Sequence, residues 1–144
     1  MVRKKQILVV DDEPAIVRLV RVKLESDGYA VLTASRGDEA LQMLQVDRPD
    51  LVILDLMMPE MDGTETLRRI RSRSQLPVIM LTALGSDREK VKGLEGGADD
   101  FVTKPFSTAE LRVRLKNLVD NNQLQKALAW QNKKLAATVE QLKE

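Results

Sequence analysis

Neither cysteine nor histidine occurs anywhere in the 144 residues of this chain. Without cysteine the chain can form no disulfide and no thiolate metal site, and without histidine it lacks the commonest general base and zinc ligand. Any chemistry must therefore come from carboxylates, lysine, hydroxyl groups or a hard metal ion.

An excess of charge of one sign and long apolar runs are also lacking. Lysine and arginine number 23 and aspartate and glutamate 22, a balance that does not favour a nucleic-acid or membrane partner chosen by bulk charge. No apolar run approaches the length of a membrane span, and the N-terminal "MVRKKQILVVDDE" is too short in apolar residues for a signal peptide. We expect a soluble cytoplasmic protein with no membrane contact and no direct binding of nucleic acid by this chain.

The apolar residues that are present, 43% of the chain, are enough for a core and occur in short runs. Segments with helical periodicity separate these runs, the first of them starting at Pro14. Strict alternation predicts an α/β fold: a doubly wound, five-stranded parallel sheet with helices on both faces, through about residue 120. The predicted strands are 7–10, 29–34, 51–54, 77–81 and 101–103, and the third and fourth helices are expected over 64–72 and 87–97.

Polar residues follow four of the five runs, and ligands of open parallel sheets bind beyond the carboxyl ends of the strands. Asp55 follows the run 51–54, and we place it at the strand's end because a carboxylate inside a strand buried on both faces would be desolvated. The other strand-end residues are Asp11, Asp12 and Glu13 after the first run, Thr82 after the fourth and Lys104 after the fifth.

Each of these residues alone has a simpler explanation, as a helix-terminal acid, a turn former, a cap or a solvated charge. Together they do not, because two carboxylates about 4 Å apart repel by roughly 4 kcal/mol at an effective dielectric constant near 20. A helix terminus offsets only about 0.3–1 kcal/mol of that. Carboxylate oxygens suit Mg²⁺, so we predict a magnesium site that also holds a phosphate, with Lys104 and Thr82 as its further contacts.

Four segments, "ILVVDDE", "LVILDLMMPEMDG", "PVIMLTA" and "DDFVTKPF", resemble the receiver domain of two-component response regulators over residues 6 to about 120. The resemblance implies a flavodoxin-like (CheY-like) sheet of strand order 2-1-3-4-5. It implies that Asp55 accepts a phosphoryl group from the phosphohistidine of a histidine kinase or phosphotransfer protein, in a reaction that requires Mg²⁺. Asp11 and Asp12, with the backbone carbonyl of Met57, would complete the metal pocket around Asp55.

The same resemblance assigns the remaining roles. Thr82 and Lys104 would contact the phosphoryl oxygens, and Phe101 would be an aromatic switch that follows Thr82. A cis peptide is implied between Lys104 and Pro105. Such a protein catalyses only its own phosphorylation and slow dephosphorylation, and is not otherwise an enzyme.

Two rival functions are weaker. "EMDGT" from Glu60 resembles the signature of haloacid dehalogenase-type magnesium phosphatases, but glutamate stands at the nucleophile position and Pro59 precedes it in a loop. A flavin-binding module would need a loop after the first strand that can hold a phosphate, and the two aspartates there would repel one.

No glycine or proline occurs between Ser107 and Glu144, which predicts one long helix and divides the chain into a receiver domain, 1–120, and a helical extension, 121–144. A heptad pattern predicts a parallel coiled coil and a homodimer. Because Asn121 interrupts the d positions, the alternative is a solvated helix that frays. Since no second apolar core follows, we expect the chain to be the N-terminal part of a longer protein or, alternatively, a stand-alone regulator. The d positions are Leu128, Leu135 and Leu142, and the a positions are Leu111, Leu118, Gln125, Asn132 and Val139.

Overall fold

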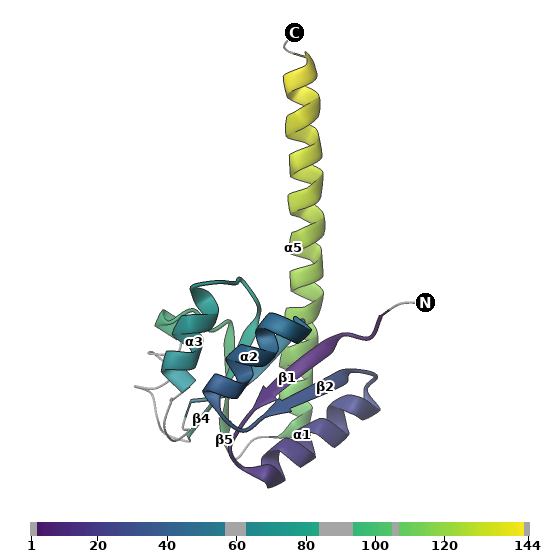
Figure 1. Ribbon diagram of the computed structural model, residues 1–144. Helices are drawn as coiled ribbons and strands as arrows, with labels where there is room; N and C mark the ends of the chain where they lie inside the picture. The colour runs from purple at the N-terminus through teal and green to yellow at the C-terminus, as the bar shows by residue number, and fades with distance from the viewer. Residues whose placement is uncertain (1–2, 57–62, 84–93, 105–106, 143–144) are drawn as a thin grey trace.

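A five-stranded parallel sheet lies at the centre of the computed structural model, which describes residues 3–56, 63–83, 94–104 and 107–142. The strand order is β2-β1-β3-β4-β5, so the predicted flavodoxin-like fold is confirmed, with the second strand at an edge (Figure 1). The strands are β1 (Gln6–Val10), β2 (Ala30–Ala34), β3 (Leu51–Asp55), β4 (Val78–Ala83) and β5 (Asp100–Lys104).

Helices connect the strands and cover both faces of the sheet (Figure 1). The first helix begins at Pro14, as predicted, because proline suits the first helical position. Most of the helix predicted over 87–97 lies outside the described residues. The described helices are α1 (Pro14–Ser26), α2 (Gly37–Asp47), α3 (Gly63–Arg71) and α5 (Thr108–Leu142).

The core has two layers, one on each face of the sheet. Successive residues of β1, such as Ile7 and Leu8, belong to different layers, since successive side chains of a strand point to opposite faces. One layer packs against α2 and α3 and the other against α1 and α5. All five residues of β3 are buried, which explains why its sequence is continuously apolar up to Asp55.

Arg71, the last residue of α3, joins three segments of the fold. Its Nε donates to the carbonyl of Gly97 at 2.8 Å, and its Nη1 donates to the carbonyl of Leu76 at 2.6 Å. Its Nη2 lies 2.8 Å from Asp99 Oδ2, which also accepts from the backbone N–H of Val78 at 2.8 Å. The guanidinium group thus holds the end of α3 against the chain that enters β4 and β5.

Replacing Arg71 by alanine should lower the free energy of unfolding by about 2 kcal/mol, because partly buried carbonyl groups would lose their donor. The measurement is urea denaturation at equilibrium. Arg69→Ala is the matched control on the same helix. Among the described residues, Arg69 forms an ion pair only with the partly exposed Glu65, at 3.0 Å, and should contribute less than about 0.5 kcal/mol. Equal losses in the two variants would contradict this role for Arg71.

The first turns of α5 belong to the core of the domain. Leu111, Leu115 and Val119 are buried against the sheet, and Leu118 packs beside them. The predicted a positions Leu111 and Leu118 are therefore used within the chain, and a seam between two chains could begin only beyond Val119. The domain boundary predicted at residue 120 falls inside α5, whose C-terminal part projects away from the sheet in Figure 1.

The coiled coil and the homodimer remain predictions. Leu128 and Leu135 are 49% and 63% exposed in the single chain, as a seam without its partner would be. We expect residues 1–144 to form a dimer by light scattering and the chain shortened after Val119 to be a monomer, since the shortened chain keeps the buried residues of α5. Equal masses at matched concentration would mean that the tail does not drive association.

Candidate functional site

Three strands bring acidic and basic side chains to the same edge of the sheet. Asp11 directly follows β1, Asp55 is the last residue of β3, and Lys104 is the last residue of β5. The side chains of Asp11 and Asp55 are 0% and 3% exposed, and Asp55 ends its strand as predicted. Asp12, beside them, is exposed to solvent.

The three aspartates form a compact group. One carboxylate oxygen of each of Asp11, Asp12 and Asp55 lies within 4.8 Å of the other two. Asp11 is held in place by its backbone, whose N–H donates to the carbonyl of Ala34 at 3.1 Å, and by the N–H of Glu13, which donates to Asp11 Oδ1 at 3.0 Å. The predicted cluster of carboxylates is therefore present, with one member open to solvent.

Lys104 lies among these carboxylates. Its Nζ is 3.0 Å from Asp11 Oδ2, 3.2 Å from Asp55 Oδ2 and 3.4 Å from Glu13 Oε1. The contact with Asp11 is an ion pair without the angles of a hydrogen bond. From the sequence we expected a metal ion to neutralise the cluster and Lys104 to contact a phosphate. The ion pairs of Lys104 with the carboxylates, including the contact with Glu13, were not predicted. Only the adjacency of Glu13 to the two aspartates could have signalled that contact.

The pKa values in the cluster reflect burial and charge. Burial raises the pKa of Asp11 to about 6, and the negative charge of Asp55 adds to this, whereas the Glu13 N–H and Lys104 oppose it. Burial alone would lower the pKa of Lys104, but the carboxylates of Asp11 and Asp55 outweigh burial and raise it. Because Asp11, Asp55 and Glu13 all lie within 3.4 Å of the one ammonium group, negative charge is in excess here even with the lysine in place.

Protonation of Asp11 should stabilise the protein when divalent ions are removed. Because its pKa is about 6 in the folded chain and ordinarily 3.8, the folded state binds the proton more tightly, and the free energy of unfolding rises as pH falls through about 6 toward 4. The gain is at most about 3 kcal/mol, from 1.4 kcal/mol per pH unit.

Urea denaturation of the wild type and of Asp11→Asn, in the presence of a chelator, measures this gain. The advantage of the variant should be largest above about pH 6 and shrink below it, since asparagine does not titrate. A difference between the two proteins that stays constant with pH would contradict the raised pKa of Asp11.

Thr82 and Phe101 lie on neighbouring strands. Thr82 is 1% exposed in β4, and its hydroxyl group has no hydrogen-bond partner among the described residues. Phe101 pairs in register with Met80 and packs against the core layer to which Met80 belongs. Thr82 is two residues beyond Met80 and therefore faces the same side of the sheet as Phe101. The two residues thus lie on neighbouring strands and on the same face of the sheet, and their coupling remains a prediction.

Two predicted features lie outside the described residues: the backbone carbonyl of Met57 and the peptide bond between Lys104 and Pro105. Both stay predictions. An open hollow of about 350 Å³ is lined by Asp11 and Asp12, whereas Asp55 and Lys104 do not line it.

The comparison with protein families decides the class of this site. The response regulator receiver domain matches residues 7–116 of the chain. The chain belongs to this family.

Relatives of the receiver domain agree in sequence and in structure. It is 46% identical over 121 residues to the alkaline phosphatase synthesis transcriptional regulatory protein PhoP of Bacillus subtilis, covering 83% of this chain and 50% of PhoP. It is 49% identical over 118 residues to the "Probable transcriptional regulator ycf27" of Cyanophora paradoxa, covering 82% of this chain and 49% of that protein. The chain thus spans about half the length of these curated relatives.

Solved structures give the same result. The receiver domain of the Francisella response regulator 1452 is 37% identical, with a TM-score of 0.78, and the match covers 83% of this chain and 99% of that one. A CheY-like receiver domain protein of Methanospirillum hungatei is 31% identical, with a TM-score of 0.80 and coverage of 85% and 99%. Nothing in these matches supports the haloacid dehalogenase alternative. Among the described residues of the receiver domain, no helix is long and apolar enough to cross a membrane.

Proposed function

We propose that this receiver domain is the phosphoacceptor of a two-component system and that Asp55 is the residue phosphorylated. One observation carries the proposal: a buried carboxylate at the end of a central strand lies 3.2 Å from an ammonium group and is grouped with two further aspartates. Structural ion pairs rarely place three carboxylates around one lysine, because burying surplus charge is costly.

The residues at the site fit a magnesium ion. Asp11, Asp12 and Asp55 offer hard oxygen ligands close together, and the exposure of Asp12 leaves one side of the group to water, which Mg²⁺ retains in part. The negative charge that Lys104 leaves uncompensated favours a divalent cation, and the carbonyl of Met57 would be a further ligand. When bound, Mg²⁺ would neutralise oxygens of the incoming phosphoryl group.

The chain's own residues account for the transfer. An oxygen of the Asp55 carboxylate attacks the phosphorus of a phosphohistidine, the bond from phosphorus to the imidazole nitrogen breaks, and an acyl phosphate forms on Asp55. The donor histidine must belong to a partner, a histidine kinase or phosphotransfer protein, since this chain has none. Lys104 and the Thr82 hydroxyl, which lacks a partner among the described residues, would bind phosphoryl oxygens.

We also propose how the phosphorylated state is passed to an output. Reorientation of Thr82 and Phe101 would pass the phosphorylated state to the surface near β5 and α5. We further propose that the protein is cytoplasmic and is not an enzyme on other substrates. Since the curated relatives named above are transcriptional regulators about twice as long, we propose that the signal controls transcription through a segment outside this chain, without nucleic-acid contacts by the chain itself.

Incubation of the full chain with acetyl phosphate tests the proposal. We expect one phosphoryl group per chain, stable in acid and labile in base, located on Asp55 by mass spectrometry and absent when a chelator removes Mg²⁺. Label on another residue would refute the assignment of Asp55, and turnover of a small phosphoester without an adduct would support a phosphatase instead.

A further inference from the structure

A hollow of about 830 Å³ lies between α2 and α3, and none of the acidic-site residues lines it. We call it the α2–α3 groove. On α2 its lining residues recur every three or four positions, so one stripe of that helix faces the hollow without a covering element. Its lining includes Leu41, Leu44 and Arg48 from α2 and Arg68, Arg73 and Leu76 from α3 and the chain after it.

The floor of the groove is aliphatic. Leu41, Leu44 and Leu76 are only partly buried, although each packs against the core layer under α2 and α3. No aromatic side chain lines the groove among the described residues, so it offers no stacking surface for a nucleobase. Such a floor suits the leucine, isoleucine or methionine side chains of a partner.

Four arginines and one acidic residue, Asp38, line the rim of the groove, and Asp38 pairs with Arg36 at 3.2 Å. Arg68 and Arg69 both pair with Glu65, at 2.6 and 3.0 Å. Arg48 and Arg73, in contrast, are exposed and have no ion-pair partner among the described residues. Two guanidinium groups are therefore left to attract carboxylates from outside the chain.

A simpler explanation covers part of this charge. Basic residues are favoured at the C-terminal ends of helices by the helix dipole, which accounts for the arginines in the last turn of α3. The dipole also favours a positive charge at Arg48, which ends α2, but it does not account for arginine at a φ of 47°, where glycine would be less strained. Nor does it account for an aliphatic hollow beside these charges.

We propose that the α2–α3 groove binds an acidic amphipathic segment of a partner protein. Apolar residues at helical spacing would fill the floor between α2 and α3, and aspartate or glutamate side chains on either side of them would pair with Arg48 and Arg73. Charge complementarity selects this occupant over a nucleotide, because the carbonyl ends of two helices repel a polyphosphate and the groove has no stacking residue. Binding at this groove requires no phosphorylation of Asp55.

Peptide selection on the full, unphosphorylated chain tests the proposal. A phage-displayed library of random peptides is selected for binding to the wild type after depletion on Arg73→Glu. We expect the selected sequences to combine leucine-like residues at spacings of three and four with several acidic residues. Selection of basic or uncharged sequences, or of none, would overturn the proposal.

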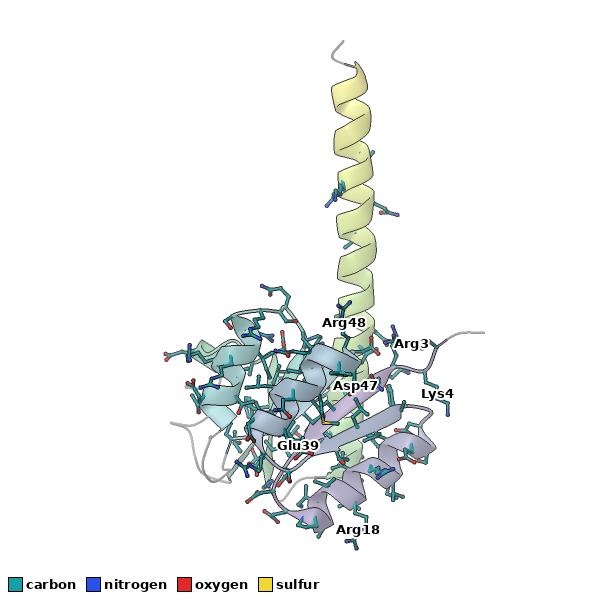
Figure 2. All side chains as sticks on the ribbon, viewed as in Figure 1. Arg3, Lys4, Arg18, Glu39, Asp47 and Arg48 are labelled. Carbon is teal, nitrogen blue, oxygen red and sulfur yellow. The ribbon has the colours of Figure 1, made fainter. Side chains whose placement is uncertain are left out.

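The affinity of a labelled selected peptide is then measured by fluorescence anisotropy. Arg73→Glu should weaken binding by about tenfold or more, and the matched charge reversal Lys4→Glu, on an exposed residue of the N-terminal segment, by less than about twofold (Figure 2). Arg48→Gly should weaken binding severalfold while raising the urea midpoint, because it removes the guanidinium group and the backbone strain together.

The Arg48→Gly variant separates binding from folding, since a variant that is more stable yet binds less tightly cannot have lost affinity by unfolding. Equal affinity of wild type, Arg48→Gly and Arg73→Glu would overturn the proposal. So would displacement of the peptide by ATP or inorganic phosphate at low concentration, which would identify the groove as a site for small anions.

Discussion

Asp55→Asn should abolish phosphorylation by acetyl phosphate while leaving the fold intact. The amide has nearly the shape of the carboxylate but is not a nucleophile at phosphorus, and no substitute oxygen ends the same strand. Without Mg²⁺ the stability should change by no more than about 1 kcal/mol, because the lost contact with Lys104 is offset by relief of repulsion with Asp11. Intact-protein mass spectrometry measures the label, and urea denaturation the stability.

Asp12→Asn is the informative companion to that variant. Asp12 belongs to the acidic group but is exposed, so its substitution should weaken metal binding and slow labelling without removing the nucleophile. More Mg²⁺ should restore the labelling of Asp12→Asn and should have no effect on Asp55→Asn. Label on Asp55→Asn at the wild-type level would place the phosphoacceptor elsewhere.

Gly63→Ala is expected to be the most destabilising single change at the edge of the site. A Cβ at Gly63 would collide with the carbonyl oxygen of Asp55 and with Cα of Leu56, and neither backbone atom can move without shifting the end of β3. We expect a loss on the order of 3 kcal/mol in the free energy of unfolding. Since Asp55 would be displaced, labelling should slow as well.

Gly28→Ala is the matched control for this effect. Gly28 has a φ of +94°, but apart from its own chain neighbours no described residue has an atom within 4 Å of the position that a Cβ would take there. Alanine therefore meets backbone strain alone, about 1 kcal/mol. Its labelling rate should equal that of the wild type, since Gly28 follows the C-terminal end of α1 whereas Asp11 and Asp12 precede the N-terminal end. A Gly63→Ala protein as stable as Gly28→Ala would show that β3 can yield at its end.

Much of the fold and several site residues could be predicted because the signals are local. An apolar run bounded by polar residues reports that a strand is buried, and this burial places Asp55 at the end of β3 before any contact is known. Proline at the start of α1 acts through its own backbone, so Pro14 marks the helix start directly. The helix over 87–97 is expected on equally local grounds, but most of it lies outside the described residues.

The contacts inside the site were harder to predict. The carboxylates were expected to meet because parallel strands share an edge, and they do. The contacts of Lys104 with Asp11, Asp55 and Glu13 could not be predicted. A lysine at a strand end can reach several acids or water, and the sequence pattern is the same in each case. Likewise the heptad pattern counted Leu111 toward a seam, whereas α5 buries that leucine against its own sheet.

By itself, then, the sequence determined which segments are strands and helices, because periodicity and burial are local signals. Strict alternation of the two determined that the strands are parallel and that the strand-end residues meet at one edge, whereas the strand order was implied only by the family resemblance. Tertiary structure alone decided the partners: Lys104 beside acids 49 and 91 positions away, Arg71 across to Gly97, Gly63 against the backbone of β3, and the basic groove between α2 and α3. Such pairings depend on the register of strands and the packing of helices, and with 45 charged residues from 23 basic and 22 acidic ones, a linear pattern cannot choose among the possible pairs.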